Sequence, residues 1–550
     1  MQNAAIHFHP DALDTSRSRL LGRHSAGESF LRGVLRHAQV EEFHLWNASA
    51  RPQPDLDALL QQIGQPAKPV RWIAGPDRAG IGAVGVLNIP SPEINREAWH
   101  RRTIGARAYA ICGVTHTTAS ATVMRTVADL LISPTEAYDA LICTSSAVRA
   151  SVESQLDGVR EYLAQEFGPR RRPELQRTTI PLGINTEEFA VTPERRAAWR
   201  ERLDIPSDAV VALYVGRFNM REKMNPALMA LALEKAAVAT GRPIYWVNSG
   251  WSETEAEEAA FHRDTQALCP SVAYRSVDGR RPDVRYSIWS VADFFISFSD
   301  NIQETYGLTP VEAMAAGLPC VVTDWDGYRD TVRHGEDGFR VPTTAPGPGL
   351  GRDLAFWFAN DWAFYANYVG AASQYVAIDY AEAVASISIL VLNADLRRKL
   401  GAQAQARARA VFDWSAIIPQ YQALWAEQDA RRRAAPAEAP VADNPFRPDP
   451  FRLFAAYPSR HLGLDDHIAL SPDLAGEAAL ARLASPQATY SRLNRPSETE
   501  VAAMLAWLAE RPEGRVADLL QIFPPARRAY ILRGVLWIAR YGLITIRPAI

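Results

Sequence analysis

Short apolar runs alternate with longer, helix-like stretches through residues 1–190. Each run is bounded by Gly, Pro, Ser or Thr, as the buried strands of a parallel sheet usually are. The strands predicted from these runs are 4–8, 43–46, 71–74, 83–88, 109–114 and 140–144, with 180–185 as a last strand and turn. Because strands alternate with helices, the pattern favours a doubly wound, mostly parallel α/β sheet.

A second series of the same kind begins at residue 210, after a charged helix predicted near 193–203. Its predicted strands are 210–217, 244–248, 272–275, 293–299, 319–323 and 338–341. Two consecutive Rossmann-like series indicate two α/β domains, residues 1–190 and 191–427. We expect a ligand site between them, at the carboxyl ends of the strands.

Residues 428–550 break this alternation. The stretch 428–450 is rich in Ala, Pro, Arg and Asp and is predicted to be a linker. Residues 451–550 suggest a small, mainly helical, winged-helix-like module, with helices predicted at 498–509, 516–522 and 526–541 and a strand at 543–546. The third helix carries arginines but is too apolar for a helix that enters a DNA groove. We therefore expect partner binding or self-association there rather than nucleic-acid binding.

The composition is that of an ordinary globular protein: 47% of the residues are hydrophobic, 22% are charged and the formal net charge is −3. This balance gives no global field that would attract nucleic acid. No apolar run has the length that spans a membrane, and the first residues do not resemble a signal peptide. The scattered cysteines Cys112, Cys143, Cys269 and Cys320 are expected to be reduced thiols. We therefore expect a cytoplasmic location, with peripheral attachment at the inner membrane left open.

The strongest chemical signal lies in residues 300–330, where two glutamates stand eight positions apart. Glu304 is in a polar loop after a predicted strand, and Glu312 is in an apolar helix. Backbone N–H groups at the start of that helix suit a diphosphate, and a carboxylate inside it can accept hydrogen bonds from a ribose diol. Either glutamate alone would more often be a helix cap or a member of a surface ion pair.

The whole string, with Tyr306, Gly307 and Leu308 between the glutamates and Gly-Leu-Pro and Thr-Asp after them, resembles a known donor-sugar signature. It is that of the retaining GT-B glycosyltransferases, family 4 in particular (glycosyltransferase group 1). The resemblance implies that the backbone of these three residues binds the donor diphosphate. It also implies that Glu304 binds the hydroxyls of the donor sugar and that Glu312 binds the ribose.

The resemblance covers roughly residues 1–430 and is strongest in the second half. It implies a GT-B fold, in which two Rossmann-like domains face a cleft. Segment 412–425 resembles the family's terminal helix, which crosses back onto the first domain. Residues 350–380, which are rich in aromatic side chains, do not match the family pattern. We interpret them as an insertion that packs on the surface or shapes a pocket.

A pair of cations follows the first strand of the second domain. Arg217 and Lys223 match the family's basic pair, and the chain has only three other lysines. Two cations at a strand end can clamp a diphosphate and neutralise the departing nucleotide, an effect that is large where water is excluded. A single residue of this kind would usually be a solvated surface charge.

Four further positions are identified through the resemblance. Gly27 lies in a stretch similar to the family's glycine-containing loop near the donor phosphate, although the serines beside it could merely cap a helix. His116 ends a first-domain strand where the family often places a histidine that reaches the transferred sugar; the alternative is a buried, hydrogen-bonded histidine. Arg275 and Val277 follow a strand where the family binds the base, mostly through backbone contacts.

The resemblance therefore implies a retaining hexosyltransferase (EC 2.4 type) that uses a nucleoside diphosphate sugar, a UDP-sugar rather than a GDP-sugar, and no metal. The catalytic group would comprise His116, Arg217, Lys223 and Glu304. The acceptor could be a glycan, a lipid-linked sugar or a protein, in bacterial glycan or glycoconjugate synthesis.

Three alternatives remain open at this point. A nucleotide-sugar epimerase or hydrolase shares the fold but matches the 307–314 region less well. A non-enzymatic sugar-nucleotide sensor could act through residues 451–550. A structural subunit of an envelope-polysaccharide complex is disfavoured, because both glutamates and both cations are intact.

Overall fold

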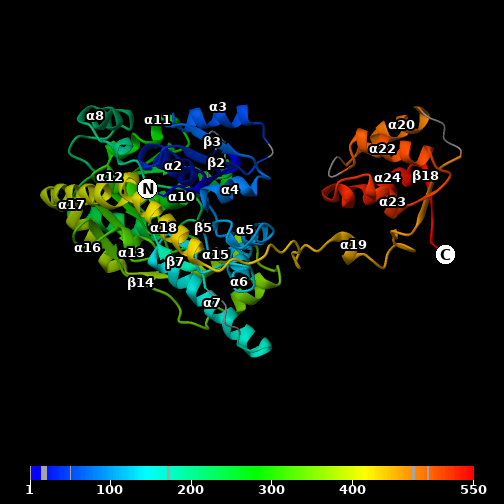
Figure 1. Ribbon diagram of the computed structural model, residues 1–550. Helices are drawn as coiled ribbons and strands as arrows, with labels where there is room; N and C mark the ends of the chain where they lie inside the picture. Colours follow the sequence, from blue (N-terminus) through cyan, green and yellow to red (C-terminus); the bar gives the residue numbers. More distant parts are fainter. Residues whose placement is uncertain are drawn as a thin grey trace. The chain divides into compact units, whose positions relative to one another are not determined.

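The computed structural model describes residues 2–13, 22–49, 51–169, 174–472, 477–491 and 495–549. The chain divides into two compact units, Met1–Ala442 and Asp443–Ile550 (Figure 1). Each unit has its own hydrophobic core and is described by itself.

The first unit contains two parallel sheets. The strands of the first are ordered β3-β2-β1-β4-β5-β6-β7, and those of the second β10-β9-β8-β11-β12-β13. The first sheet comprises β1 Ala5–Phe8, β2 Phe43–Asn47, β3 Val70–Ile73, β4 Val86–Ile89, β5 Ala110–Val114, β6 Ala140–Cys143 and β7 Gln176–Thr179. The second comprises β8 Val210–Val215, β9 Ile244–Gly250, β10 Ala273–Asp278, β11 Phe294–Ser297, β12 Cys320–Thr323 and β13 Gly338–Val341. In both sheets the chain moves outward from its first strand and then returns to that strand's other side, which is the doubly wound Rossmann order.

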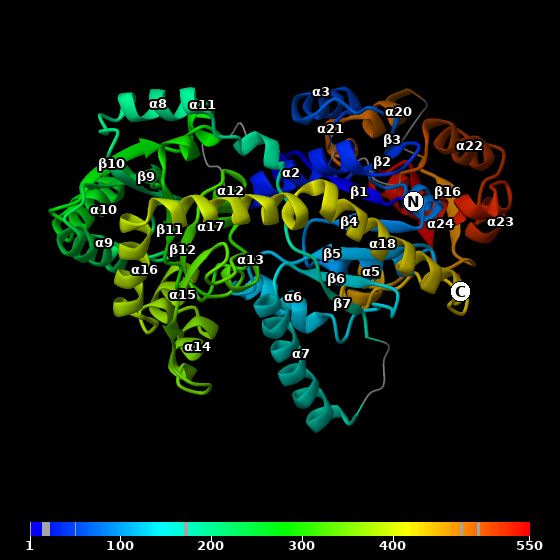
Figure 2. The ribbon, with the colours of Figure 1, turned by 90° about the vertical axis from the view of Figure 1, so that its left-hand side faces the viewer.

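Helices connect these strands and cover the sheets (Figure 2). Those of the first sheet are α1 Pro10–Leu13, α2 Gly22–His37, α3 Gln53–Ile63, α4 Arg78–Val84, α5 Ile94–Arg102, α6 Ala121–Asp129 and α7 Ser146–Phe167. The connection to the second sheet contains η1 Thr186–Phe189 and α8 Pro193–Arg202. The second sheet has α9 Ala227–Thr240, α10 Glu255–Ala267, α11 Pro282–Arg285, η2 Ile288–Val291, α12 Leu308–Ala315, α13 Tyr328–Thr331, α16 Tyr380–Leu392, α17 Ala394–Arg407 and η3 Ala408–Phe412. The predicted α/β fold class, with two Rossmann-like domains, is confirmed.

Strand side chains alternate between two cores on opposite faces of each sheet. In β1, Ile6 and Phe8 face one core of the first sheet, whereas Ala5 faces the other. In β8, Leu213 and Ala212 divide between the two cores of the second sheet in the same way. Because both faces are covered by helices, the strands are apolar throughout, and this is why the sequence shows continuous apolar runs.

Two strand predictions need correction. Residues 180–185 are not a strand: β7 precedes them, and its Gln-Arg-Thr-Thr sequence is polar because it is an edge strand. Ile180 and Ile184 are both buried, and two buried apolar residues at this spacing resemble the pattern of a strand. Residues 83–84 end α4, and β4 begins only at Val86 after a left-handed Gly85 with φ of 96°.

Helix α18 (Trp414–Ala434) follows the second sheet in sequence but packs against α2, β4 and β5 of the first (Figure 2). Its Trp414 and Trp425 are buried in a core of the first sheet. The side chain of Gln428 donates to the backbone carbonyls of Ile111 and Tyr138, both at 3.0 Å. The linker predicted to begin at residue 428 therefore begins later, because this buried contact extends the helix to Ala434.

The segment 350–380 forms its own small substructure. It contains α14 (Arg352–Ala359), α15 (Tyr365–Ser373) and β15 (Ala377–Ile378), which pairs antiparallel with β14 (Thr343–Thr344) just before the segment. No residue of α14 is buried, whereas α15 buries Val369, Gly370 and Ser373.

The second unit has a three-stranded antiparallel sheet in the order β17-β16-β18 and several short helices (Figure 1). These elements are α19 Pro450–Leu453, β16 His467–Leu470, α20 Glu477–Ala484, α21 Pro486–Thr489, α22 Glu498–Ala509, β17 Gly514–Arg515, α23 Val516–Gln521, η4 Pro525–Arg527, α24 Arg528–Arg540 and β18 Ile544–Arg547. The predicted helices and terminal strand thus occur close to their expected positions. The winged-helix assignment stays a prediction.

All four cysteines are free and buried. Among the helices of the described ranges, none combines the length and apolar character needed to cross a membrane.

Candidate functional site

The carboxyl ends of the two sheets meet within the first unit. The hydroxyl of Ser145, which follows β6, donates to the Asp326 carboxylate, which follows β12, at 3.2 Å. The backbone N–H and the hydroxyl of Ser146 donate to Asp330 at 2.6 and 2.7 Å. The loops that follow the strands of both domains therefore lie against each other, where open α/β sheets bind ligands.

Glu304 and Lys223 form an ion pair at the boundary where the strand-end loops of the two domains meet. They lie in the loops after β11 and β8, which are neighbouring strands, and the Lys223 ammonium donates to Glu304 Oε2. The side chains of Asn301 and Gln303 donate to backbone carbonyls of the Lys223 turn at 2.6 and 2.7 Å. Burial by itself would raise the pKa of Glu304, but the charge and hydrogen bond of Lys223 outweigh it and lower that pKa. Glu304 is therefore a preformed carboxylate held by two tied loops.

Arg217, the second predicted cation, pairs with Glu222 of the same turn at 3.1 Å. Both cations therefore have an acidic partner within the protein. A diphosphate that carries two negative charges would compete for both cations, and its binding would redistribute these pairs.

The turn between Glu304 and α12 presents backbone N–H groups to the boundary. Thr305 and Tyr306 donate their N–H groups toward Glu304 and lower its pKa. Gly307 has φ of 81°, and a Cβ there would lie 2.0 Å from the Tyr328 ring, so only glycine fits. Leu308 then begins the helix. Tyr306 itself is buried and donates its hydroxyl to the Leu182 carbonyl at 2.8 Å, which anchors the turn to the segment that connects the domains.

Glu312 lies in α12 and is partly buried. Unlike Glu304, its carboxylate makes no hydrogen bond or ion pair within the described part of the chain. Burial raises its pKa to about 7, while the charges of Arg285 and Lys223 oppose that rise. An acidic group left without a partner beside two cations is available to a ligand.

His116 lies across the boundary from these residues, after β5. Its neighbour Thr117 shares a hydrogen bond of 3.2 Å with the hydroxyl of Tyr365, the first residue of α15. The electrostatic influence of Arg217 and Glu222 reaches the same Tyr365 hydroxyl. The loop that carries His116 is therefore close to the turn that carries Arg217 and Glu222. Helix α15 of segment 350–380 contacts the His116 loop.

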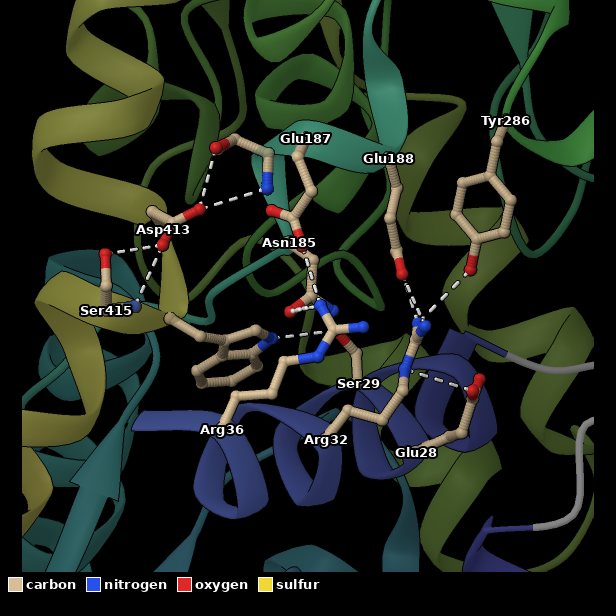
Figure 3. Close-up of polar contacts among 12 residues, drawn as sticks. Glu28, Ser29, Arg32, Arg36, Asn185, Glu187, Glu188, Tyr286, Asp413 and Ser415 are labelled. Carbon is tan, nitrogen blue, oxygen red and sulfur yellow. Dashed lines mark hydrogen bonds and ion pairs between the residues drawn. The ribbon is translucent and has the colours of Figure 1, made fainter. Parts of the chain in front are cut away.

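Helix α2 ties the first domain to the second (Figure 3). The Arg32 guanidinium donates to both oxygens of Glu188 in the connecting η1, and to the Tyr286 hydroxyl at 3.3 Å. Glu28 faces Arg285 of α11 at 3.6 Å. Arg285 also influences Glu312, so charged groups extend from α2 to the predicted ribose carboxylate.

Gly27 occupies a different local structure from the one expected. The glycine-containing stretch was predicted to be a loop that leads into a helix, but α2 already begins at Gly22 and Gly27 lies inside it. Burial of the apolar face of α2, including Leu31 and Val34, outweighs the modest cost of a glycine in a helix. The prediction of a loop at Gly27 is therefore wrong, whereas its contact with the donor stays a prediction.

Arg275 and Val277 lie within β10, not after a strand. The Arg275 guanidinium donates to the carbonyl of Leu203 at 2.9 Å and lies over the Tyr245 ring. Val277 is buried in a core of the second sheet. Any contact of these two residues with a base would have to come from the backbone, since both side chains have structural positions.

Two acidic or basic groups of the boundary were not assigned roles from the sequence. Asp326 has a positive φ of 43°, and burial together with the charge of Glu304 raises its pKa to about 8. Arg285 looks like an ordinary surface arginine in the sequence, and only the structure places it near Glu28 of α2 and near Glu312. Neither has a local signal that would have revealed it, apart from the position of Asp326 just after a strand.

Residues 195–347 match the family model described as "Glycosyl transferases group 1". Among curated proteins, the chain is 27% identical over 164 residues to "Putative glycosyltransferase EpsD" of Bacillus subtilis, covering 29% of this chain and 40% of that protein. It is 30% identical over 165 residues to a D-inositol 3-phosphate glycosyltransferase of Streptomyces scabiei, covering 29% of this chain and 36% of that one. The chain thus spans less than half the length of these relatives, and the residues that match the family model include β8 to β13 of the second sheet.

Solved structures with a related backbone include Anabaena Alr3699/HepE in complex with UDP. It has a TM-score of 0.48 and 15% identity, over 78% of this chain and 100% of that one. Sucrose-phosphate synthase from Thermosynechococcus elongatus has a TM-score of 0.46 and 16% identity over the same shares.

Proposed function

We propose that this protein is a retaining glycosyltransferase that moves a sugar from a nucleoside diphosphate sugar to an acceptor hydroxyl. The observation that carries the proposal is the arrangement of three groups in the family-matched region. The ion pair of Glu304 and Lys223 lies near Glu312 of α12, and Glu312 has no hydrogen-bond or ion-pair partner among the described residues. This arrangement supplies a carboxylate for the sugar, a cation for the diphosphate and an acceptor for the ribose.

The chemistry would depend mainly on position and charge. Arg217, Lys223 and the Tyr306–Leu308 backbone would stabilise the negative charge that develops on the leaving diphosphate. In a front-face reaction with retention, that diphosphate helps to deprotonate the incoming hydroxyl while an oxocarbenium-like state forms briefly. The protein aligns the two partners. His116, on the opposite domain, would orient the transferred sugar.

The donor we propose is a UDP-sugar, used without a metal. The two cations would take the role that a divalent ion has in other transferases, since they face the same charge. The acceptor would be a glycan, a lipid-linked sugar or a protein in bacterial glycan or glycoconjugate synthesis. Residues 451–550 would serve self-association or a partner protein.

The test is turnover of UDP-, GDP- and ADP-sugars by the purified chain, and it is measured as release of the nucleotide. We expect Glu304→Ala to abolish release. Asp353→Asn, an exposed acid on α14 outside the boundary, serves as the control and should leave it unchanged. NMR of the product's anomeric centre tests retention. Full turnover by Glu304→Ala would contradict the proposal, and formation of an epimer without acceptor would favour an epimerase instead.

A further inference from the structure

A cavity of about 790 Å³ lies between the turn after β8, the end of β11 and helix α15. Its polar lining includes Arg221, Asn225, Asp300, Asn367 and Gln374. Arg221 and Asn225 flank Lys223 in sequence, and Asp300 precedes Glu304 in the loop after β11. The cavity therefore shares two of its walls with the loops of the predicted donor site.

Asp300 contributes a carboxylate to the wall of this cavity. Its residue is 8% exposed, and its buried Oδ1 has no hydrogen-bond partner among the residues that the structure describes. Burial raises its pKa to about 7. The part of the Asp300 carboxylate that faces the cavity can accept a hydrogen bond from a ligand. A hydroxyl or amide N–H group could donate that bond.

The wall contributed by α15 is built from small side chains. Ala366, Gly370 and Ala371 line the cavity, and a Cβ at Gly370 would lie 3.2 Å from Arg221 Cβ. The helix therefore approaches the turn closely at Gly370, while the alanines leave open space next to it. A helix that only covered a core would be expected to fill this space with larger side chains.

Exposed aromatic side chains stand at both ends of α15. Phe364, just before the helix, is 77% exposed, and Tyr375, just after it, is 62% exposed. Neither side chain is part of the cavity lining, and both lie on the exposed surface beside α15. A sugar ring has a polar edge that suits amides and carboxylates and a C–H face that suits an aromatic ring.

We propose that this cavity is an acceptor subsite that binds a hydroxyl-rich saccharide. The proposal rests on the proposed transferase function and names the class of its acceptor. An aliphatic ligand would leave Asp300 without a donor, and a divalent ion would find only one carboxylate among the lining residues. The Tyr365–Thr117 contact places α15 beside the His116 loop, so a saccharide in the cavity can extend toward the donor sugar.

The experiment measures saccharide binding to the full chain by saturation-transfer NMR, with UDP present. The probes are methyl α-glucoside, methyl α-N-acetylglucosaminide and maltotriose. Ala371→Trp fills the cavity, and Asn367→Ala removes one amide without adding bulk. Asn360→Ala, an exposed amide of the same insertion, is the control because it lies outside the lining. Melting curves verify that each variant is folded.

We expect at least one probe to bind, and Ala371→Trp to weaken that binding about tenfold or more. Asn367→Ala should weaken it less, and Asn360→Ala should leave it unchanged, with UDP affinity the same in all variants. Absence of binding by every probe, or binding that survives Ala371→Trp, would overturn the subsite. If the unmodified chain does not turn over any UDP-sugar, the proposed function is overturned instead. The two outcomes are distinguishable because saccharide binding is measured without turnover.

Discussion

Removal of the Lys223 ammonium tests both the stability and the chemistry of the Glu304 pair. The Glu304 side chain is only 11% exposed and that of Lys223 is 23% exposed. Lys223→Met would therefore leave a buried carboxylate without its cation. Loss of one member of a fully buried pair costs about 3–5 kcal/mol. Because Lys223 retains some contact with solvent, we expect a loss of about 2–3 kcal/mol in the free energy of unfolding.

The double variant Lys223→Met, Glu304→Gln separates stability from function. With both charges gone, most of the lost free energy of unfolding should return, with a coupling of about 1–3 kcal/mol. Nucleotide release should remain about 100-fold to 1000-fold slower in both variants, since the cation that meets the developing charge is absent.

The pH dependence of the free energy of unfolding provides a further check on the ion pair. In the unmodified protein the pKa of Glu304 is lowered, so its contribution to stability is present above its unfolded pKa and is lost as pH falls through the folded one. In Lys223→Met, burial is no longer opposed by the ammonium and the pKa of Glu304 rises. The destabilisation should therefore shrink as pH is lowered from about 7 to about 5.

Urea unfolding followed by circular dichroism measures these stabilities, and nucleotide release measures activity. Lys235→Met is the matched control, because Lys235 is an exposed lysine on α9. We expect it to change neither quantity. The reasoning would be refuted if Lys223→Met retained full activity, or if the double variant were no more stable than the single one.

Three further predictions follow from other parts of the structure. The pKa of Glu312 is raised to about 7, so the affinity for UDP-glucose, measured by calorimetry, should rise between about pH 6 and 8 as the carboxylate ionises. Glu312→Gln should remove that pH dependence, and a dependence that persists in this variant would argue against the ribose role. A Cβ at Gly33 would lie 2.5 Å from the Trp414 ring, so Gly33→Ala should lower the free energy of unfolding by about 1–3 kcal/mol. Gly158→Ala in α7, where a Cβ has no neighbour within 4 Å among the described residues, should not destabilise the protein, and equal effects of the two substitutions would contradict the packing. A chain ending at Ala442 should keep its melting temperature and UDP affinity because residues 443–550 have a separate core; loss of folding would show that the two units depend on each other.

Local patterns in the sequence determined the identity of most elements and the chemistry at the strand ends. Strands such as β8 and β11 were readable because their side chains are buried on both faces, which leaves an apolar run. The Glu304–Glu312 spacing was readable because both residues belong to one loop and helix. The edge strand β7 was missed because a strand at the edge of a sheet is less covered and does not need an apolar sequence.

Tertiary structure decided which of these groups meet. Lys223 and Glu304 are 81 residues apart, and they pair because the sheet order places β8 beside β11. The approach of α15 to Thr117 likewise depends on how the two domains pack. Hydrophobic periodicity records which face of an element is buried but not which element covers it. The sequence alone therefore determined the fold class and the candidate carboxylates, whereas the partners of those carboxylates and the cavity beside them arise only from the packing of distant segments.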